Sequence, residues 1–421
     1  MKKRILIKNI KELVLVEFPG EEKLRVSGKE MDKLQTVSNA WLAIEGELIA
    51  GFGSMADWEG ITDWTNLEII DAEGKFVIPA FCDSHTHIVY SGNRENEWVA
   101  RLNGKSYEEI ANEGGGIINS ALKLRGESEE DLFQQALVRA NEIISQGTGA
   151  VEIKSGYGLS LESELKMLRV IKRLKEETPL TIKSTLLAAH AIPPEFQGNK
   201  EGYVNHIIEE IIPAVQKEGL ADFIDIFCEK GYFDNIDTKR ILEAGKSVGL
   251  KAKYHVNQFT ISGGVEVGVK LDALSVDHLE VLDDGEIDLL NNKNTISTIL
   301  PSCSFFLEIP YSPARKMIDS GLSVALATDY NPGSTPSGKM PFVMSLACVK
   351  MKMKINEVFN AACLNGAYAM DLSNELGSIA IGKKANVLIT KEMPSYSFIP
   401  YSFGGDHFDE VILNGERIKS N

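Results

Sequence analysis

The sequence has few cysteines, and their spacing argues against two kinds of small, cross-linked architecture. The chain of 421 residues contains five cysteines, an odd number, which are widely spaced and include no C-x-x-C pair. Disulfide frameworks and structural zinc knuckles depend on paired, regularly spaced cysteines. Neither is therefore expected, and a reducing compartment, the cytoplasm, fits this composition best.

Long apolar runs and an excess of positive charge are also missing. No apolar stretch reaches the roughly 18 residues that a membrane-spanning helix requires. The segment MKKRILIKNI begins with basic residues, but Lys8 interrupts its apolar run after three residues, so no signal peptide is expected. A net charge of -16 argues against nucleic acid and anionic membranes as partners. A small anionic substrate is compatible with this charge, because its binding depends on local charge.

What the sequence does contain is a globular composition, with 43% hydrophobic and 25% charged residues. Both ends of the chain contain short segments rich in Val, Ile and Phe that are separated by Gly and Asn, which is typical of strands joined by turns. Between these ends, apolar runs alternate with charged segments of helical period, such as SEEDLFQQALVRANEIISQG and LESELKMLRVIKRLKEE.

Eight apolar runs in this middle part predict strands. Strands that alternate with helices favour right-handed βαβ units and a parallel sheet. Eight such units over about 290 residues predict a (β/α)8 barrel, and a doubly wound open sheet is the competing fold. The candidate strands are FVIPAFCDSH, GAVEIKSG, LTIKSTLLAAH, ADFIDIFCE, LKAKYHVNQ, ALSVDHLE, NTISTILPS and SVALATDYNPG.

Histidines gather where these strands are expected to end. In a parallel barrel the carboxyl ends of all strands meet at one mouth, where active sites are built. Side chains that are far apart in the sequence would therefore converge in space. The residues at these ends are His85, His87, His190, His255, His278 and Asp329.

His85 and His87 have the spacing of two ligands for one metal ion. Strand side chains alternate with period two, so the two imidazoles point the same way and can share a cation. Such a pair alone is more often two hydrogen-bonded polar residues, but every further strand that ends in His or Asp favours a metal site. His255 and Asp329 would complete a set of three nitrogens and one carboxylate, which suits Zn²⁺ and also Fe²⁺ or Mn²⁺.

Several of these segments resemble known proteins. PAFCDSHTH, KYHVNQ, SVDHLE and ALATDYNPGS are similar to the amidohydrolase superfamily. Within that superfamily, the chain resembles the imidazolonepropionase family over roughly residues 77–370, and EIKSGYGL together with TDYNPGS is the most specific part of the likeness. The other matching stretches are SYEEIANEGGGI, ETPLTIKSTLLAAHAIPPE, FCEKGYF and DALSVDHLE.

The resemblance implies a fold, an activity and a cofactor. The fold is a TIM-like metal-dependent hydrolase barrel at residues 79–371, with a small composite β-sandwich domain formed by residues 1–78 and 372–421. The activity is hydrolysis of the cyclic amide C–N bond of 4-imidazolone-5-propanoate, giving N-formimidoyl-L-glutamate in histidine degradation. One Zn²⁺ or Fe ion per subunit is expected, and the chain is expected to form a homodimer. The implied metal ligands are His85, His87, His255 and Asp329.

The resemblance also assigns roles around the metal. Asp329 and His278 are the available proton acceptors, and His190 could polarise the amide oxygen or hold the oxyanion. Arg94 follows the first strand, and its planar guanidinium suits the carboxylate tail of the substrate. The expected substrate contacts are Arg94, Tyr107, Tyr157, His190, Gln258, Asn331, Gly333 and Ser334.

One position departs from the family pattern. Family members often have H-A-D-E or H-A-D-Q after the histidine of the fifth strand, whereas this chain has His255, Val256, Asn257 and Gln258. An amide can hydrogen-bond but cannot accept a proton as a carboxylate does. A base role at position 258 is therefore in doubt, and Asp329 and His278 become the expected proton acceptors.

Three alternatives remain open at this stage. A two-metal site bridged by a modified lysine would use Lys230, in the FCEKG segment that ends the fourth strand. A deaminase of the same superfamily would act on a nucleobase-like ring, and it would release ammonia. A catalytically dead barrel would serve only as a binding protein, although the intact set of ligands argues against it.

Overall fold

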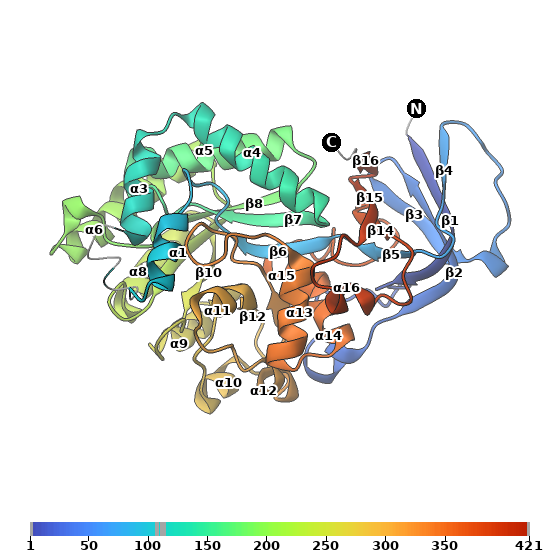
Figure 1. The fold of residues 1–421 in the computed structure, drawn as a ribbon. Helices are drawn as coiled ribbons and strands as arrows, with labels where there is room; N and C mark the ends of the chain where they lie inside the picture. Colours follow the sequence, from blue (N-terminus) through green and yellow to red (C-terminus); the bar gives the residue numbers. More distant parts are fainter. Residues whose placement is uncertain (1–2, 106–108, 110–114, 419–421) are drawn as a thin grey trace.

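A computed structural model describes residues 3–105, 109 and 115–418 (Figure 1). Its central feature is an eight-stranded sheet, in the order β13-β12-β11-β10-β9-β8-β7-β6, in which every neighbouring pair of strands is parallel. Each of the eight candidate segments contains one of these strands, either completely or except for one end residue. They are β6 (Phe81–Thr86), β7 (Thr148–Lys154), β8 (Thr181–Ala189), β9 (Phe223–Cys228), β10 (Lys251–Val256), β11 (Ser275–His278), β12 (Ile296–Ile299) and β13 (Val324–Leu326).

The segments that follow the first and last strands close this sheet into a barrel. The backbone N–H of Asp329 donates to the carbonyl of His85 at 3.0 Å, and the N–H of His87 donates to the carbonyl of Tyr330 at 2.9 Å. The closure lies at the carboxyl ends of the strands, so it joins two expected metal-ligating segments directly. The predicted barrel is confirmed, and the open doubly wound sheet is wrong.

Helices surround the barrel (Figure 1). The two segments with the clearest helical period form α4 (Glu129–Ser145) and α5 (Leu161–Glu177), whose N-caps Ser128 and Ser160 accept hydrogen bonds from the first turn. Their apolar positions recur three and four residues apart and are buried against the strands. The other helices of the barrel are α1 (Glu95–Leu102), α3 (Gly116–Gly126), α6 (Lys200–His206), α7 (Ile212–Glu218), α8 (Asn235–Ser247), α9 (Gly264–Lys270), α10 (Asp284–Leu290), α11 (Pro301–Leu307), α12 (Ala314–Asp319), α13 (Met340–Met351), α14 (Ile355–Ala362) and α15 (Leu364–Ala369).

A second sheet is built from both ends of the chain. Its order is β16-β15-β14-β5-β1-β2-β3, with β4 paired to β1, and the antiparallel pairing of β5 with β14 joins the two ends. The strands are β1 (Arg4–Val14), β2 (Thr36–Glu45), β3 (Leu48–Ser54), β4 (Leu67–Asp71), β5 (Phe76–Pro79), β14 (Val387–Thr390), β15 (Phe408–Leu413) and β16 (Glu416–Ile418). This arrangement confirms a barrel with a small sheet domain, whose strands join in one mixed sheet.

The first candidate strand, FVIPAFCDSH, is two strands. The chain changes sheets at Ala80, whose N–H donates to Asn386, just before β14 of the terminal sheet, whereas the N–H of Phe81 donates to Gly147 next to β7. The apolar residues on both sides of the change are buried, so hydrophobic pattern alone did not mark the boundary.

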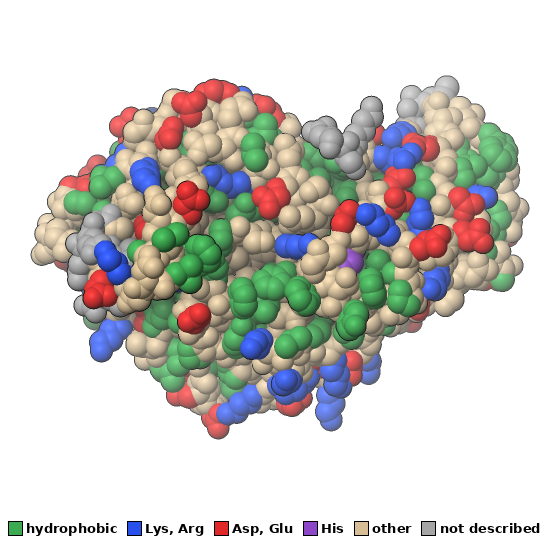
Figure 2. All heavy atoms as spheres, in the orientation of Figure 1, with side chains coloured by type: hydrophobic (Ala, Val, Ile, Leu, Met, Phe, Trp, Pro, Cys, Tyr) green, Lys and Arg blue, Asp and Glu red, His purple; other side chains and the backbone are tan. Residues whose placement is uncertain are grey.

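One face of the molecule carries a row of aromatic side chains. Phe305 of α11, Phe342 of α13 and Phe403, just after α16 (Phe398–Tyr401), have successive ring centroids 5.4 Å and 6.3 Å apart. Phe305 and Phe403 are exposed, and Figure 2 shows hydrophobic side chains gathered on this face. Among the described residues, no helix is both long and apolar enough to span a membrane.

Candidate metal centre and substrate pocket

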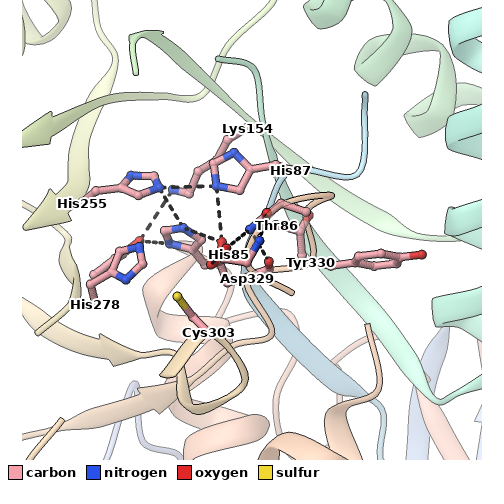
Figure 3. Close-up of polar contacts among 12 residues, drawn as sticks. His85, Thr86, His87, Lys154, His255, His278, Cys303, Asp329 and Tyr330 are labelled. Carbon is pink, nitrogen blue, oxygen red and sulfur yellow. Dashed lines mark hydrogen bonds and ion pairs between the residues drawn. The ribbon is translucent and has the colours of Figure 1, made fainter. Parts of the chain in front are cut away.

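The predicted metal ligands converge at the mouth of the barrel (Figure 3). Nε2 of His255 lies 3.1 Å from Nε2 of His85 and 3.3 Å from Nε2 of His87. Oδ1 of Asp329 lies 3.7 Å and 3.6 Å from the Nε2 atoms of His85 and His87. All four residues are almost completely buried.

The hydrogen bonds of these imidazoles determine which nitrogen is free for a ligand role. Nδ1 of His85 lies 2.7 Å from a carboxylate oxygen of Asp277, and Nδ1 of His255 lies 3.0 Å from both oxygens of Asp225. A carboxylate only accepts, so each Nδ1 carries the proton. Burial holds the pKa values of His85 and His255 well below the usual value, so the rings are neutral and each Nε2 has only a lone pair.

Lone pairs that face each other at about 3 Å repel unless a cation lies between them. Ligand nitrogens about 2.0–2.1 Å from a tetrahedral Zn²⁺ lie roughly 3.3 Å from one another, which is close to the separations seen here. His85, His87, His255 and Asp329 therefore fit a metal ion in distance and donor type, and His85 and His255 also fit it in protonation.

A buried layer of charges lies beneath this cluster. Nζ of Lys154 lies 2.6 Å from Glu152, 2.8 Å from Asp225 and 3.6 Å from Asp277. Lys253 also pairs with Glu152 and lies 3.7 Å from Asp277. All five side chains are fully buried. Two ammonium groups thus hold in place the carboxylates that orient His85 and His255, a supporting role known to strengthen metal binding.

The proton acceptors expected from the sequence lie at the cluster and have altered acidity. Burial raises the pKa of Asp329 to about 6, although the nearby His278 and a hydrogen bond from Ser334 oppose this shift. Burial lowers the pKa of His278, but Glu280 and other carboxylates outweigh this effect and leave the pKa above its usual value. Two neighbouring groups with such shifts are typical of a site of proton transfer.

The backbone is strained where these side chains enter the site. His278 and the following Leu279 have φ angles of 87° and 61°, and Asp329 has φ 57°. Non-glycine residues rarely adopt these left-handed conformations, and strain of this kind collects at functional sites. The side-chain amide of Asn331 donates to the carbonyl of Asp329 at 2.7 Å, and this hydrogen bond holds the backbone at Asp329 in place.

A pocket beside the metal cluster contains the predicted substrate contacts that the structure describes. Asn331 accepts from the N–H groups of Gly333 and Ser334 at 2.8 Å, which makes the rim next to Asp329 a rigid turn. Tyr107 lies outside the described residues. The predicted contacts that line the pocket are Arg94, Tyr157, His190, Gln258, Asn331, Gly333 and Ser334.

His190 presents a hydrogen-bond acceptor to this pocket. Its Nδ1 donates to the carbonyl of Gly156 at 3.0 Å, and burial lowers its pKa to about 4, so the ring is neutral near pH 7. The remaining Nε2 then has no proton to donate. This geometry favours contact with an N–H group of a substrate over the oxyanion role expected from the sequence.

Arg94 also lines the pocket. Its Nε and Nη2 donate to one oxygen of Glu97 at 2.8 Å and 2.5 Å, and Glu97 also accepts from the N–H of Gly116 at 3.1 Å. Nη1 packs against Gly333, where a methyl group would lie only 2.1 Å away. Glu97 and Gly333 therefore fix the position of the guanidinium.

The side chain of Gln258 and the loop that follows it are both anchored. Its Nε2 lies 3.4 Å from the buried Sγ of Cys303, so its carbonyl oxygen is left for the pocket. The carboxylate of Glu229 accepts from the N–H groups of Phe259 and Thr260 at 2.9 Å and 3.3 Å, which anchors the following loop. Gln258 can thus serve as an acceptor in substrate binding.

The sequence analysis missed the residues that support the metal cluster. It also considered Lys230 as the bridge of a two-metal site, and this lysine lies elsewhere. Lys230 is exposed, so the bridged two-metal alternative has no lysine at the site from that segment. The lysine that was missed is Lys154, beneath the cluster. The sequence contains a sign of such buried charges, because charged residues alternate with apolar ones in the strands GAVEIKSG and LKAKYHVNQ. The other residues not anticipated are Glu152, Asp225, Lys253, Asp277, Glu229, Glu280 and Cys303.

Comparison with known proteins agrees with this geometry. The model of the amidohydrolase family matches residues 266–418. Solved structures with the same fold include a guanine deaminase from C. acetobutylicum (TM-score 0.70, 17% identity, 99% of this chain and 100% of that one) and an adenosine deaminase from Xanthomonas campestris with bound zinc (0.69, 14%, 98% and 92%). At these identities the likeness concerns the fold alone.

A parallel barrel with histidines and an aspartate converging at its mouth defines a metal-dependent hydrolase of the amidohydrolase class. The chain is 58% identical over 415 residues to an imidazolonepropionase of Christiangramia forsetii (98% of this chain, 100% of the relative) and 55% identical over 413 residues to one of Flavobacterium johnsoniae (98% and 99%). It belongs to the imidazolonepropionase family, and it is a hydrolase that acts on a small-molecule substrate.

Proposed function

We propose that this protein hydrolyses 4-imidazolone-5-propanoate to N-formimidoyl-L-glutamate, a step of histidine degradation. The observation that carries the proposal is the pocket itself, which Arg94, the acceptor His190 and the metal-cluster residues line together. Each part of this substrate has a matching group in the pocket. The propionate matches a cation, a ring N–H matches an acceptor, and the cyclic amide matches the metal cluster. Full-length relatives named imidazolonepropionase support the same substrate.

We propose one Zn²⁺ or Fe ion per chain, held by His85, His87, His255 and Asp329. When bound, the ion polarises the amide carbonyl and lowers the pKa of water from about 15.7 toward about 7. The neutral imidazoles of His85 and His255 are already in the tautomer that this binding requires, because Asp277 and Asp225 accept their other protons.

Proton transfer is assigned to Asp329 and His278. Asp329 has one oxygen beside the histidines, and its other oxygen accepts from the Ser334 hydroxyl at 2.8 Å, which fixes the direction of the carboxylate. His278 lies beside His85 and His255, with ring centroids 5.5 Å and 5.2 Å away. These two groups can take a proton from water and return it to the leaving nitrogen.

Orientation of the substrate is assigned to the pocket walls. Arg94 binds the propionate, His190 accepts from a ring N–H, and the carbonyl of Gln258 supplies a second acceptor. Tyr157, Asn331, Gly333 and Ser334 complete the contacts, and Tyr107 is assigned to the same role on the family resemblance alone.

We also propose the division of the chain, its assembly and its compartment. Strand membership supports a composite terminal domain at residues 1–78 and 372–421 and a barrel at residues 79–371. The aromatic row of Phe305, Phe342 and Phe403, of which Phe305 and Phe403 are exposed, offers an apolar surface for a homodimer. The five cysteines, all described, are free, which suits the reducing cytoplasm.

The test is incubation with freshly prepared 4-imidazolone-5-propanoate. Loss of its ultraviolet absorption with equal formation of N-formimidoyl-L-glutamate and no ammonia is the expected result. Ammonia release from nucleobase-like rings, without turnover of the imidazolone, would replace the proposal with a deaminase. Tight binding without turnover by metal-loaded protein would indicate the dead barrel.

A further inference from the structure

Three buried side chains next to the metal cluster form a second group of potential ligands. Ligating atoms of His278, Glu280 and Cys303 lie within 4.8 Å of one another, and none of the three residues is more than 3% exposed. Neither Glu280 nor Cys303 belongs to the ligand set of the catalytic ion. Figure 3 shows the sulfur of Cys303 directed toward the cluster of histidines.

One atom of this group lacks a partner. Oε1 of Glu280 lies 3.1 Å from Nδ1 of His278, but Oε2 is buried and has no hydrogen-bond partner among the described residues. Leaving a buried carboxylate oxygen unpaired is costly, and most such atoms in native proteins are satisfied. A buried thiol alone would pack as a small apolar group, whereas this thiol lies beside an imidazole and a carboxylate that has one unpaired oxygen.

We propose that His278, Glu280 and Cys303 form a second, inhibitory binding site for a thiophilic divalent ion such as Cd²⁺ or excess Zn²⁺. Thiolate, imidazole and carboxylate are all ligands of zinc, and a thiolate selects soft ions over Mg²⁺ or Mn²⁺. Binding replaces the thiol S–H bond by a sulfur–metal bond and releases the proton to solvent. No electron is transferred in this step.

Inhibition follows because His278 is shared. Its ring converges with His85 and His255 as well as with Glu280 and Cys303. An ion at Nδ1 displaces the proton that Glu280 accepts, and this second proton also leaves to solvent. The bound ion holds the ring away from its role in proton transfer. This part rests on the proposed function, whereas binding of the ion does not.

The route to the site passes through the substrate pocket. Gln258 lines that pocket and its Nε2 contacts the sulfur of Cys303, which does not itself line the pocket. An ion that reaches the sulfur from this pocket displaces the amide of Gln258. Bound substrate analogue is therefore expected to slow the loading of the second ion.

The experiment titrates Cd²⁺ into protein that already holds its catalytic ion. One further equivalent should bind, with the ultraviolet charge-transfer absorption of a thiolate–Cd²⁺ bond, and activity should fall in parallel. Cys303→Ser should lose this absorption and bind Cd²⁺ at least roughly tenfold more weakly. Cys348→Ser, which removes a half-buried thiol on α13, should behave as the unaltered protein does.

Glu280→Gln is the second variant, and it keeps the thiol. It should weaken Cd²⁺ binding while the absorption at saturation remains. The proposal is overturned if the absorption persists in Cys303→Ser, or if the protein binds no Cd²⁺ beyond its catalytic site. The absorption does not depend on the substrate, so a protein that fails to hydrolyse the imidazolone still tests the site.

Discussion

Nδ1 of His85 lies 2.7 Å from Oδ2 of Asp277, and both side chains are completely buried beneath the metal cluster. The carboxylate fixes the tautomer of the ring, so Nε2 is free to bind a metal. Asp225 does the same for His255. The tautomers that would let His85 and His255 bind a metal ion therefore depend on two aspartates outside the proposed ligand set.

Asp277→Asn is expected to weaken metal binding. An amide that donates to Nδ1 would move the ring proton to Nε2, the atom needed by the metal. Loss of such a supporting carboxylate typically lowers metal affinity about 10- to 100-fold. Metal content after dialysis against graded concentrations of a chelator measures this effect. Asp371→Asn, which alters an exposed partner of Lys251, is the control, and equal metal retention in both variants would contradict the role of Asp277.

Lys154→Met is expected to destabilise the folded protein even with metal bound. Lys154 neutralises Glu152, Asp225 and Asp277 inside the barrel, and removing one partner of a buried ion pair costs about 3–5 kcal/mol. Urea unfolding of metal-loaded protein should show a clearly lower midpoint.

The matched control for this prediction is Lys391→Met, whose partner Asp406 is exposed. Loss of an exposed pair changes stability by about 1 kcal/mol or less. Similar midpoints for the two variants would show that the buried lysine is dispensable and that the carboxylates are neutralised in another way.

The barrel could be predicted from the sequence because its signals are local. Each strand is a short apolar run, and α4 and α5 have clear helical periods with capping serines. The change of sheet at Ala80 could not be predicted, because buried strands of two sheets have the same apolar pattern. The hydrogen-bond partner of Ala80 at this change of sheet is Asn386, which is 306 residues away along the chain (386 minus 80).

The site could be predicted only in part, for a reason that β11 illustrates. Strict alternation would place His278 on the face opposite Asp277, yet both lie near His85. The left-handed φ of 87° at His278 breaks the alternation, and no sequence pattern marks it.

Arg94→Met is expected to reduce kcat/KM for the proposed substrate by about 30- to several-thousandfold, because the buried carboxylate of the substrate would lose its cationic partner. Arg94→Lys should recover only part of this loss, since an ammonium lacks the planar fork. The control is an imidazolone without the carboxylate, which both proteins should process equally poorly. A similar loss for the tailless analogue would mean that Arg94 does not bind the propionate.

Gly333→Ala tests the placement of Arg94 without removing its charge. A methyl group at residue 333 would lie 2.1 Å from Nη1 of Arg94 and 2.8 Å from its Cζ, closer than any real contact, so the guanidinium must move. The metal ligands are untouched, so we expect KM to rise for the proposed substrate while metal content stays at the level of the unaltered protein. Steady-state kinetics and elemental analysis measure the two effects.

Two comparisons make this last prediction specific. Gly404→Ala places its methyl group in open space, with nothing within 4 Å, and should change neither KM nor kcat. The tailless imidazolone should be processed by Gly333→Ala as well as by the unaltered protein, because it makes no use of the guanidinium. If Gly333→Ala instead lowers kcat equally for both substrates, the added methyl disturbs the turn of Asn331 and Ser334 beside Asp329. The close packing of Arg94 on Gly333 would then not be what orients the substrate tail.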